Sequence, residues 1–224
     1  MISRRNLLLA GAAGLASLAA PHRGFAKMAF DAPGEFANRR FAVFYKGDRI
    51  GAHTVVTSPE TGETRVNTEI AIAVKALFFT MLSYTHSSEE RWRNGKLVFL
   101  KSETVEHGEK IYVDGTSAIH GFRVVSLGGP FIASADALTS NGMWNPAILQ
   151  QDTLIDAQHG GIIGVSARKQ ADEQILVLDR QITAARYRFI TPYLAGSIWY
   201  DDSGHWVHGE FEHDGAMIDY RLEA

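Results

Sequence analysis

The sequence predicts a mainly β protein, organised as one curved antiparallel sheet of about ten or more strands in the shape of a half-barrel or a β-spiral. Most of the chain alternates polar and apolar residues with period two. Glycine-containing pairs such as Asn94-Gly95 and His107-Gly108 separate the alternating segments, as turns separate neighbouring strands. No internal repeat or low-complexity linker divides the chain, so residues 27–224 are predicted to form a single β-rich domain.

The first predicted hairpin contains the sequence FAVFYKGDRIGAHTV. A two-residue turn at Gly47-Asp48 would pair Tyr45 with Ile50 and Val43 with Ala52. In the next strand, TRVNTEIAIAV, alternation places five side chains on one apolar face, namely Val66, Thr68, Ile70, Ile72 and Val74.

The stretch YTHSSEERWRNG forms the strand before the turn at Asn94-Gly95. That turn would pair Trp92 with Leu97 and Arg91 with Val98. Alternation places on one face the side chains of Tyr84, His86, Ser88, Glu90 and Trp92. Both faces of this strand carry polar residues, so alternation leaves open which face is buried.

One short helix is predicted near residues 146–151, because Asn145 can cap it and Pro146 suits its first position. The preceding segment, residues 126–142, has the weakest pattern and is predicted to be a long loop between two halves of the sheet.

The last hairpin has the clearest register. A turn at Asp214-Gly215 sets Phe211 against Ile218 and Gly209 against Tyr220 on an apolar face. The opposite, polar face holds His208, Glu210 and Glu212.

Residues 1–26 are predicted to be a cleaved export signal. Arg4 and Arg5 precede an apolar run that is too short and too rich in Gly and Ala to anchor a protein in a membrane. The motif SRRNLLL resembles a twin-arginine signal, and small residues flank a cleavage point after Ala26. The sequence therefore predicts a soluble periplasmic protein whose precursor uses the twin-arginine export machinery.

Composition argues against several classes of protein. The leader contains three of the 22 Lys and Arg and none of the 25 Asp and Glu, so the mature chain has a net charge of −6. An acidic chain without a basic run is not expected to bind nucleic acid. The chain contains no cysteine, so no disulfide and no lipid attached to cysteine is expected. No phosphate loop or other enzyme motif occurs, and no cofactor is predicted.

His86 and Glu90 are the candidate catalytic pair. A histidine beside a buried carboxylate can act as an acid–base pair or form a purely structural hydrogen bond. Residues four apart on a strand are separated by roughly 13 Å, so a third group such as Asp156 or Asn145 would be needed between them. A structural role is the preferred interpretation.

Apolar residues between Ala76 and Leu82 would occupy both faces of a strand, which is typical of ordinary core or of the wall of an apolar cavity. If a cavity exists, the residues expected to line it are Phe78, Phe79, Met81, Trp92 and Trp144. Such aromatic and Met walls suit lipid-like ligands.

The histidines near the C-terminus are not predicted to bind metal. His205, His208 and His213 are close in sequence, but alternation places His208 on the opposite face from the other two. A solvated polar face is the preferred interpretation, and no metal site is predicted.

Four segments together resemble a family of exported proteobacterial proteins of unknown function. They are FYKGDRIGAHTV, EERWRNGKLVFLKSETVEHGEKIYV, MWNPAILQQDTLIDAQHG and IWYDDSGHWVHGEFEHDGAMIDYRL. More distantly, the sequence is similar in style to the envelope-integrity β-spiral proteins and the half-barrel lipoprotein carriers, although it lacks the cysteines that some of them carry. The resemblance implies a fold and a compartment, not an activity.

Three functions remain open. The preferred one is a non-enzymatic periplasmic protein that binds a lipid-like ligand or an envelope partner in the concave face of its sheet. The alternatives are a hydrolase that uses His86 and Glu90, and a structural envelope protein that works through an exposed sheet edge.

The tryptophans give a structural expectation. Trp144 precedes the predicted helix and should be buried where it joins that helix to the sheet. Trp206 shares a predicted face with His208 and Glu210 and should be partly exposed.

Overall fold

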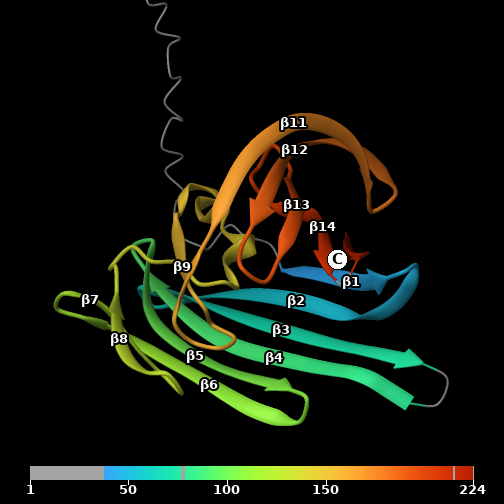
Figure 1. Ribbon diagram of the computed structural model, residues 1–224. Helices are drawn as coiled ribbons and strands as arrows, with labels where there is room; N and C mark the ends of the chain where they lie inside the picture. Colours follow the sequence, from blue (N-terminus) through green and yellow to red (C-terminus); the bar gives the residue numbers. More distant parts are fainter. Residues whose placement is uncertain (1–37, 77–78, 214, 224) are drawn as a thin grey trace, which may run out of the picture.

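A computed structural model describes residues 38–223 of the chain, except residues 77, 78 and 214. These residues form a 13-stranded antiparallel sheet and a separate two-stranded sheet. The large sheet has two free edges, β8 and β11, so it is open, and it curves over on itself (Figure 1). The predicted mainly β architecture with one large, curved antiparallel sheet is confirmed.

The first described strand, β1, lies in the middle of the sheet, and eight consecutive antiparallel strands run from it outward to one edge. These strands are β1 (Arg39–Tyr45), β2 (Asp48–Glu60), β3 (Glu63–Ala76), β4 (Phe79–Arg93), β5 (Lys96–Glu106), β6 (Glu109–Ala118), β7 (Gly121–Ser126) and β8 (Gly129–Ala133). Short turns join them, as expected for a meander.

A crossover segment, residues 134–165, then leads to the opposite edge. It contains two 3₁₀ helices, η2 (Gly142–Trp144) and η3 (Pro146–Gln150), and the two-stranded sheet of β9 (Thr153–Ile155) and β10 (Ile162–Gly164). The predicted helix is therefore a 3₁₀ helix, and the Asn145 side chain caps it by accepting a hydrogen bond from the backbone of Ala147 at 3.0 Å. The predicted loop 126–142 was wrong in part, because it includes β8.

Five strands return from the second edge to the middle. They are β11 (Ser166–Val177), β12 (Arg180–Ile190), β13 (Ala195–Tyr200), β14 (Trp206–His213) and β15 (Ala216–Leu222). Strand β15 pairs with β1, so the last strand lies beside the first described strand in the middle of the sheet. The β11–β12 hairpin arches over the layer formed by β2 to β6, and the crossover segment lies between the two (Figure 1).

Two of the predicted registers are confirmed. In the last hairpin, Phe211 lies opposite Ile218 and Gly209 opposite Tyr220. At the turn of Asn94 and Gly95, Trp92 lies opposite Leu97. Both turn residues have positive φ, 51° and 71°, which is the geometry of a tight hairpin turn with glycine in second place.

Two other register predictions were wrong. Arg91 lies opposite Phe99, not Val98, since the pairing shifts between Arg91 and Trp92. In the first hairpin the turn is at Lys46 and Gly47, one residue earlier than predicted, so Tyr45 lies opposite Asp48 and not Ile50. A second shift then places Val43 opposite Gly51 and not Ala52. A bulge adds one residue to one strand, and simple counting from the turn does not reveal it.

The apolar core lies on the concave side of the sheet. The face of β4 that carries Trp92 points inward, as do Val66 and Ile70 of β3. Trp144, at the end of η2, is 3% exposed and packs edge-to-face on Trp92 at 5.4 Å between ring centroids. The crossover segment is thus held against the inner face of the sheet, and the predicted burial of Trp144 is confirmed.

The expectation that Trp206 is partly exposed was wrong. Its side chain is 1% exposed and stacks on Phe41 at 3.9 Å between centroids. Strand β14 begins at this residue, next to a bulge between Trp199 and Tyr200, so the alternation that holds further along the strand does not apply. Gly209 has no side chain, and a Cβ there would lie 2.9 Å from the Phe211 ring but at an ordinary contact distance of 3.5 Å from the Trp206 indole nitrogen. The glycine therefore leaves room for the Phe211 ring.

Candidate binding site

A cavity of about 660 Å³ lies on the concave side of the sheet, between β1–β4, the crossover segment and the 189–194 segment. Most of its wall is apolar or aromatic, including Ile50, Ile70, Ile72, Val74, Leu154, Ile163, Phe189, Leu194 and Ile218. Its volume is within the usual range for sites that enclose a small molecule. Side chains of β1 to β4 and β15 line it, together with Phe189 at the end of β12.

Three polar groups of the cavity wall have no hydrogen-bond partner among the residues that the structure describes. They are His53 Nε2, the Tyr84 hydroxyl and Asn141 Oδ1. His53 is 5% exposed and Asn141 is 3% exposed. Buried polar groups in folded proteins are nearly always hydrogen-bonded, so three unpartnered ones on one cavity are unusual.

Asn141 is held in place by a chain of polar side chains. Its Nδ2 contacts His86 Nε2 at 2.8 Å and donates to Ser88 Oγ at 2.9 Å. Because the amide nitrogen donates, His86 accepts at Nε2 and carries its hydrogen on Nδ1, which lies 2.8 Å from Thr104 Oγ1. This network links β4 and β5 to the crossover segment and orients the Asn141 amide.

His53 and His86 are neutral. Burial, with a smaller contribution from the nearby His86, lowers the pKa of His53 to about 3. Burial also lowers the pKa of His86 to about 4, with a smaller contribution from His159. Burial raises the pKa of Tyr84, so its hydroxyl stays protonated. This part of the wall therefore offers hydrogen bonds without charge.

Glu90 is fully buried beside the Trp92–Trp144 pair. Its Oε1 accepts from the Thr139 hydroxyl, and its Oε2 accepts from Trp92 Nε1 at 3.0 Å. Burial raises the pKa of Glu90 to about 7, while the two hydrogen bonds act in the opposite direction. Glu90 connects the sheet to the crossover segment at Thr139.

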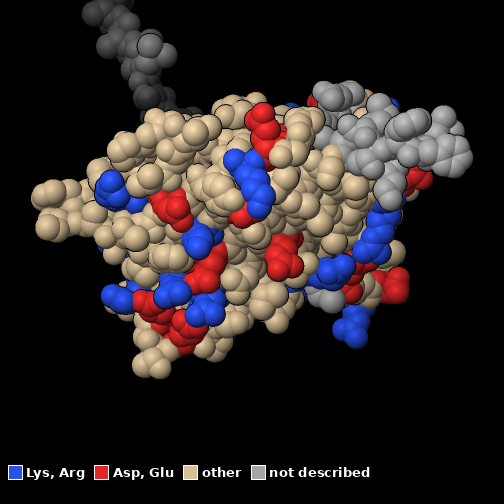
Figure 2. Space-filling model, turned by 90° about the horizontal axis from the view of Figure 1, so that it is seen from below, with Lys and Arg blue, Asp and Glu red and all other residues tan. Residues whose placement is uncertain are grey.

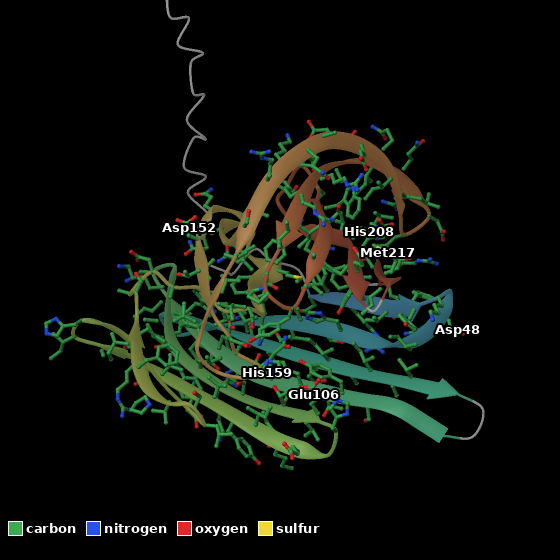
Figure 3. The ribbon with its side chains drawn as sticks, viewed as in Figure 1. Asp48, Glu106, Asp152, His159, His208 and Met217 are labelled. Carbon is green, nitrogen blue, oxygen red and sulfur yellow. The ribbon has the colours of Figure 1, made fainter. Side chains whose placement is uncertain are left out.

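A second polar cluster borders the cavity at the end of β5. His159 Nε2 lies 3.3 Å from a Glu106 oxygen (Figure 3). Its Nδ1 lies 3.2 Å from Asp156 Oδ2. The other Asp156 oxygen accepts the backbone hydrogens of Gln158 and His159. The ring of Tyr193 lies 5.7 Å from that of His159. Both carboxylates of the cavity wall thus already have partners.

The proposed catalytic pair is not brought together. His86 is hydrogen-bonded to Thr104 and Asn141, whereas Glu90 is hydrogen-bonded to Thr139 and Trp92, and neither lines the cavity. The two helpers considered from the sequence also lie elsewhere. Asn145 caps η3, and Asp156 is bonded to His159. The arrangement ties the crossover segment to the sheet and does not form a catalytic triad.

The proposed cavity residues lie in different places. Trp92 and Trp144 belong to the packed core and are not among the residues that line the cavity. Phe78 lies outside the described residues, as do the side chains of Phe79 and Met81. Reasoning from the sequence missed His53, Tyr84 and Asn141. The available signal was a polar residue at an inward position of an otherwise apolar strand face, which is His53 between Gly51 and Val55.

The histidines near the C-terminus have separate partners. His205 Nδ1 lies 3.2 Å from Asp201, and His208 Nδ1 lies 2.9 Å from the Tyr220 carbonyl. The side chain of His213 lies outside the described residues. Within the described part of the chain, no cluster of three or more metal-ligating residues occurs. Nor does any described helix have the length and apolarity needed to cross a membrane.

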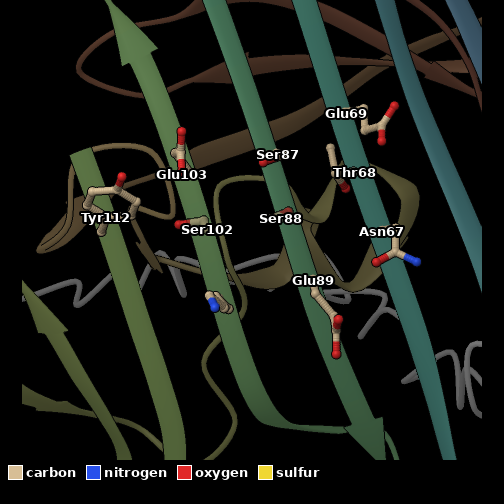
Figure 4. Close-up of a pocket in the computed structure, with 10 residues that line it drawn as sticks. Asn67, Thr68, Glu69, Ser87, Ser88, Glu89, Ser102, Glu103 and Tyr112 are labelled. Carbon is tan, nitrogen blue, oxygen red and sulfur yellow. The ribbon is translucent and has the colours of Figure 1, made fainter. Parts of the chain in front are cut away.

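The outer face of the sheet carries a shallower polar hollow of about 310 Å³ over β3 to β6 (Figure 4). Lys and Arg lie beside Asp and Glu on the face seen from below (Figure 2). Ion pairs such as Arg91–Glu89 and Lys110–Glu103 satisfy carboxylates of this hollow within the protein. These paired, solvent-facing charges are typical of a wetted sheet surface, and the inner cavity is the better candidate site.

Comparisons with known proteins agree with this architecture. The crystal structure of a β-barrel-like protein of the DUF1849 domain of unknown function, from Brucella abortus, superimposes with a TM-score of 0.59. The match covers 83% of this chain and 94% of that one at 9% sequence identity, so the likeness concerns the fold alone. A comparison with curated proteins finds no match. The family model for a domain of unknown function, DUF6134, matches residues 41–223, and the protein therefore belongs to the DUF6134 family.

Proposed function

We propose that this protein is exported to the periplasm, where it binds an apolar, lipid-like small molecule in its inner cavity without changing it chemically. The observation that carries the proposal is the cavity itself, about 660 Å³ in volume and lined mainly by aliphatic and aromatic side chains. Pockets of this size with few polar groups are typical of sites for small apolar ligands.

The hydrolase alternative has less support. His86 and Glu90 have separate hydrogen-bond partners, and neither borders the cavity. A pair that acts on a substrate must reach it within hydrogen-bond distance.

The structural alternative, an envelope protein that joins partners through a sheet edge, also has less support. Edge β8 is five residues long and contains Pro130, and edge β11 carries charged residues such as Arg168 and Asp172. Short, charged or proline-containing edges are the usual means by which proteins prevent strand addition.

A fluorescent apolar probe, N-phenyl-1-naphthylamine, tests the binding proposal. We expect its emission to rise on binding to the wild-type protein, and Ile72→Trp to abolish the rise because the larger side chain fills the cavity. Val125→Trp, at an exposed position of β7, is the matched control and should bind as the wild type does. Absence of binding to the wild type, or equal binding to Ile72→Trp, contradicts the proposal.

The natural ligand class can be examined by native mass spectrometry of protein purified from the periplasm. A bound apolar molecule that is absent from Ile72→Trp supports the proposal.

Export is tested separately. Replacing both Arg4 and Arg5 with Lys should leave the precursor in the cytoplasm, because the twin-arginine pathway requires the arginine pair. Undiminished periplasmic protein would refute the export assignment.

A further inference from the structure

We propose that the cavity selects amphiphiles with an uncharged hydroxyl head, and that this head binds between His53, Tyr84 and Asn141. The inference rests on the proposed function and adds the chemical class of the ligand. It follows from two observations: three polar atoms of the wall lack hydrogen-bond partners, and the described wall offers no positively charged side chain to an anionic head.

The unpartnered atoms define what the head must offer. Asn141 Oδ1 can only accept a hydrogen bond, and the Tyr84 hydroxyl can donate one. A hydroxyl group both donates and accepts, so it is the ligand group that complements both residues. His53 Nε2 provides a third contact. Leaving such groups unpaired costs free energy in the unliganded protein, and a ligand that pairs them recovers it.

The Asn141 acceptor is rigidly presented. Both hydrogens of its amide are used, one toward His86 and one toward Ser88, so Oδ1 cannot exchange places with Nδ2 without breaking both contacts. The backbone around it is also held, because Gly142 N donates to Thr139 O at 3.0 Å and Ser140 N donates to Ile155 O at 2.8 Å. A preorganised acceptor favours a ligand with a donor at one defined position.

The charges of the wall disfavour an anionic head. Among the described residues that line the cavity there is no Lys or Arg. The histidine at this end is neutral, since burial lowers the pKa of His53 to about 3. A carboxylate or phosphate placed there would lose its hydration without gaining a counter-charge. Glu106 and Asp156 would add repulsion.

A cationic head is also disfavoured. Glu106 and Asp156 border the cavity, but both are already bonded to His159. An ammonium group would have to compete with that histidine. The neutral hydroxyl is therefore the head that the wall accommodates without breaking an existing contact.

Competition against N-phenyl-1-naphthylamine tests the inference with three ligands of one chain length, dodecanol, dodecanoate and dodecylamine. We expect dodecanol to displace the probe at roughly tenfold lower concentration than either charged ligand, because burying an unpaired charge is costly.

The second arm uses Tyr84→Phe, which removes only the unpartnered hydroxyl. We expect it to weaken dodecanol binding roughly 3- to 10-fold, which is the effect of one hydrogen bond, and to leave probe binding and thermal stability unchanged or raised. Tyr193→Phe, whose residue is 63% exposed on the same cavity, is the matched control and should not change dodecanol binding.

The outcomes separate this inference from the proposed function. If neither the probe nor any ligand binds, the inference about the head and the proposed binding function both fail. If the probe binds but dodecanol and dodecanoate compete equally, or dodecylamine competes best, the inference about the head fails and the binding function stands. An unchanged dodecanol affinity in Tyr84→Phe overturns the placement of the head.

Discussion

The two halves of the inner surface are built differently. The inner face of β4 holds the crossover segment through side-chain hydrogen bonds, in which Asn141 donates to His86 and Ser88, and Thr139 donates to Glu90. The inner face of β14, β15 and β1 is aromatic. There, Trp206 stacks on Phe41, and Tyr220 packs on Phe211 with ring centroids 5.7 Å apart.

The difference follows from what each half must hold. Strands β14, β15 and β1 are already aligned by backbone hydrogen bonds, so apolar side chains need only fill the space between them. The crossover segment has short 3₁₀ helices and three-residue strands, which have little stability of their own. Directional hydrogen bonds give it one position on the sheet. The cavity lies where the two kinds of surface meet.

The largest expected effect concerns the aromatic half. Trp206→Ala should lower the free energy of unfolding by about 3–5 kcal/mol, because a fully buried ring is removed from a packed cluster. Trp144→Ala, in the hydrogen-bonded half, should cost a similar amount, since both rings are buried. Urea denaturation of the two variants measures this. A loss for Trp206→Ala of less than half that for Trp144→Ala would show that the aromatic cluster contributes little.

Breaking the hydrogen-bonded half should have a somewhat smaller effect. Asn141→Ala removes the partner of both His86 Nε2 and Ser88 Oγ and should cost about 2–4 kcal/mol. Asn145→Ala in the same segment is the matched control and should cost only about 1 kcal/mol, as the loss of a helix cap does. Urea denaturation again gives both values. Equal losses would mean that the network does not determine the docking.

The halves should also differ in pH dependence, because the titrating groups lie in and around the hydrogen-bonded half. His53 and His86 have folded pKa values of about 3 and about 4, against 6.5 in the unfolded chain. Their contribution to the free energy of unfolding is therefore complete above pH 6.5 and is lost as the pH falls. Glu90 has a folded pKa of about 7 against 4.5, so its contribution is complete below pH 4.5 and is lost as the pH rises toward 7.

Between pH 4.5 and 6.5, His53 and His86 therefore each raise the free energy of unfolding by about 1.4 kcal/mol per unit of rising pH. Glu90 lowers it by the same amount per unit. Glu90→Gln removes the opposing group. We expect its free energy of unfolding to rise with pH about 1.4 kcal/mol per unit more steeply than that of the wild type in this window. Urea denaturation at a series of pH values checks the difference, in which other titrating groups cancel. Parallel profiles would show that Glu90 titrates normally.

The smallest effect concerns an exposed contact of the crossover segment. Lys96 at the β4–β5 turn forms an ion pair of 3.1 Å with Asp136, and both side chains are mostly exposed. Lys96→Ala should change the free energy of unfolding by no more than about 0.5 kcal/mol, as solvent screens such pairs. A thermal or urea transition clearly below that of the wild type would show that exposed charge also holds the segment.

Local chemistry made several features predictable. The turn at Asn94-Gly95 and the set of β4 side chains that share a face with Trp92 follow from glycine geometry and from a period of two, but which face points inward does not. The cap at Asn145 follows from the Asn-Pro sequence. The burial of Trp206 was not predictable in this way, because a bulge in the neighbouring strand changes the alternation.

By itself, the sequence determined most of the strands and turns and which residues share a face, because these depend on residues within a few positions of one another. Only the tertiary structure decided the candidate site. His53, Tyr84 and Asn141 come from β2, β4 and the crossover segment, and they share one cavity only because the sheet curves and the crossover lies inside it. A hydrogen-bond partner, or the lack of one, is a property of groups that meet in space, and no local pattern records it.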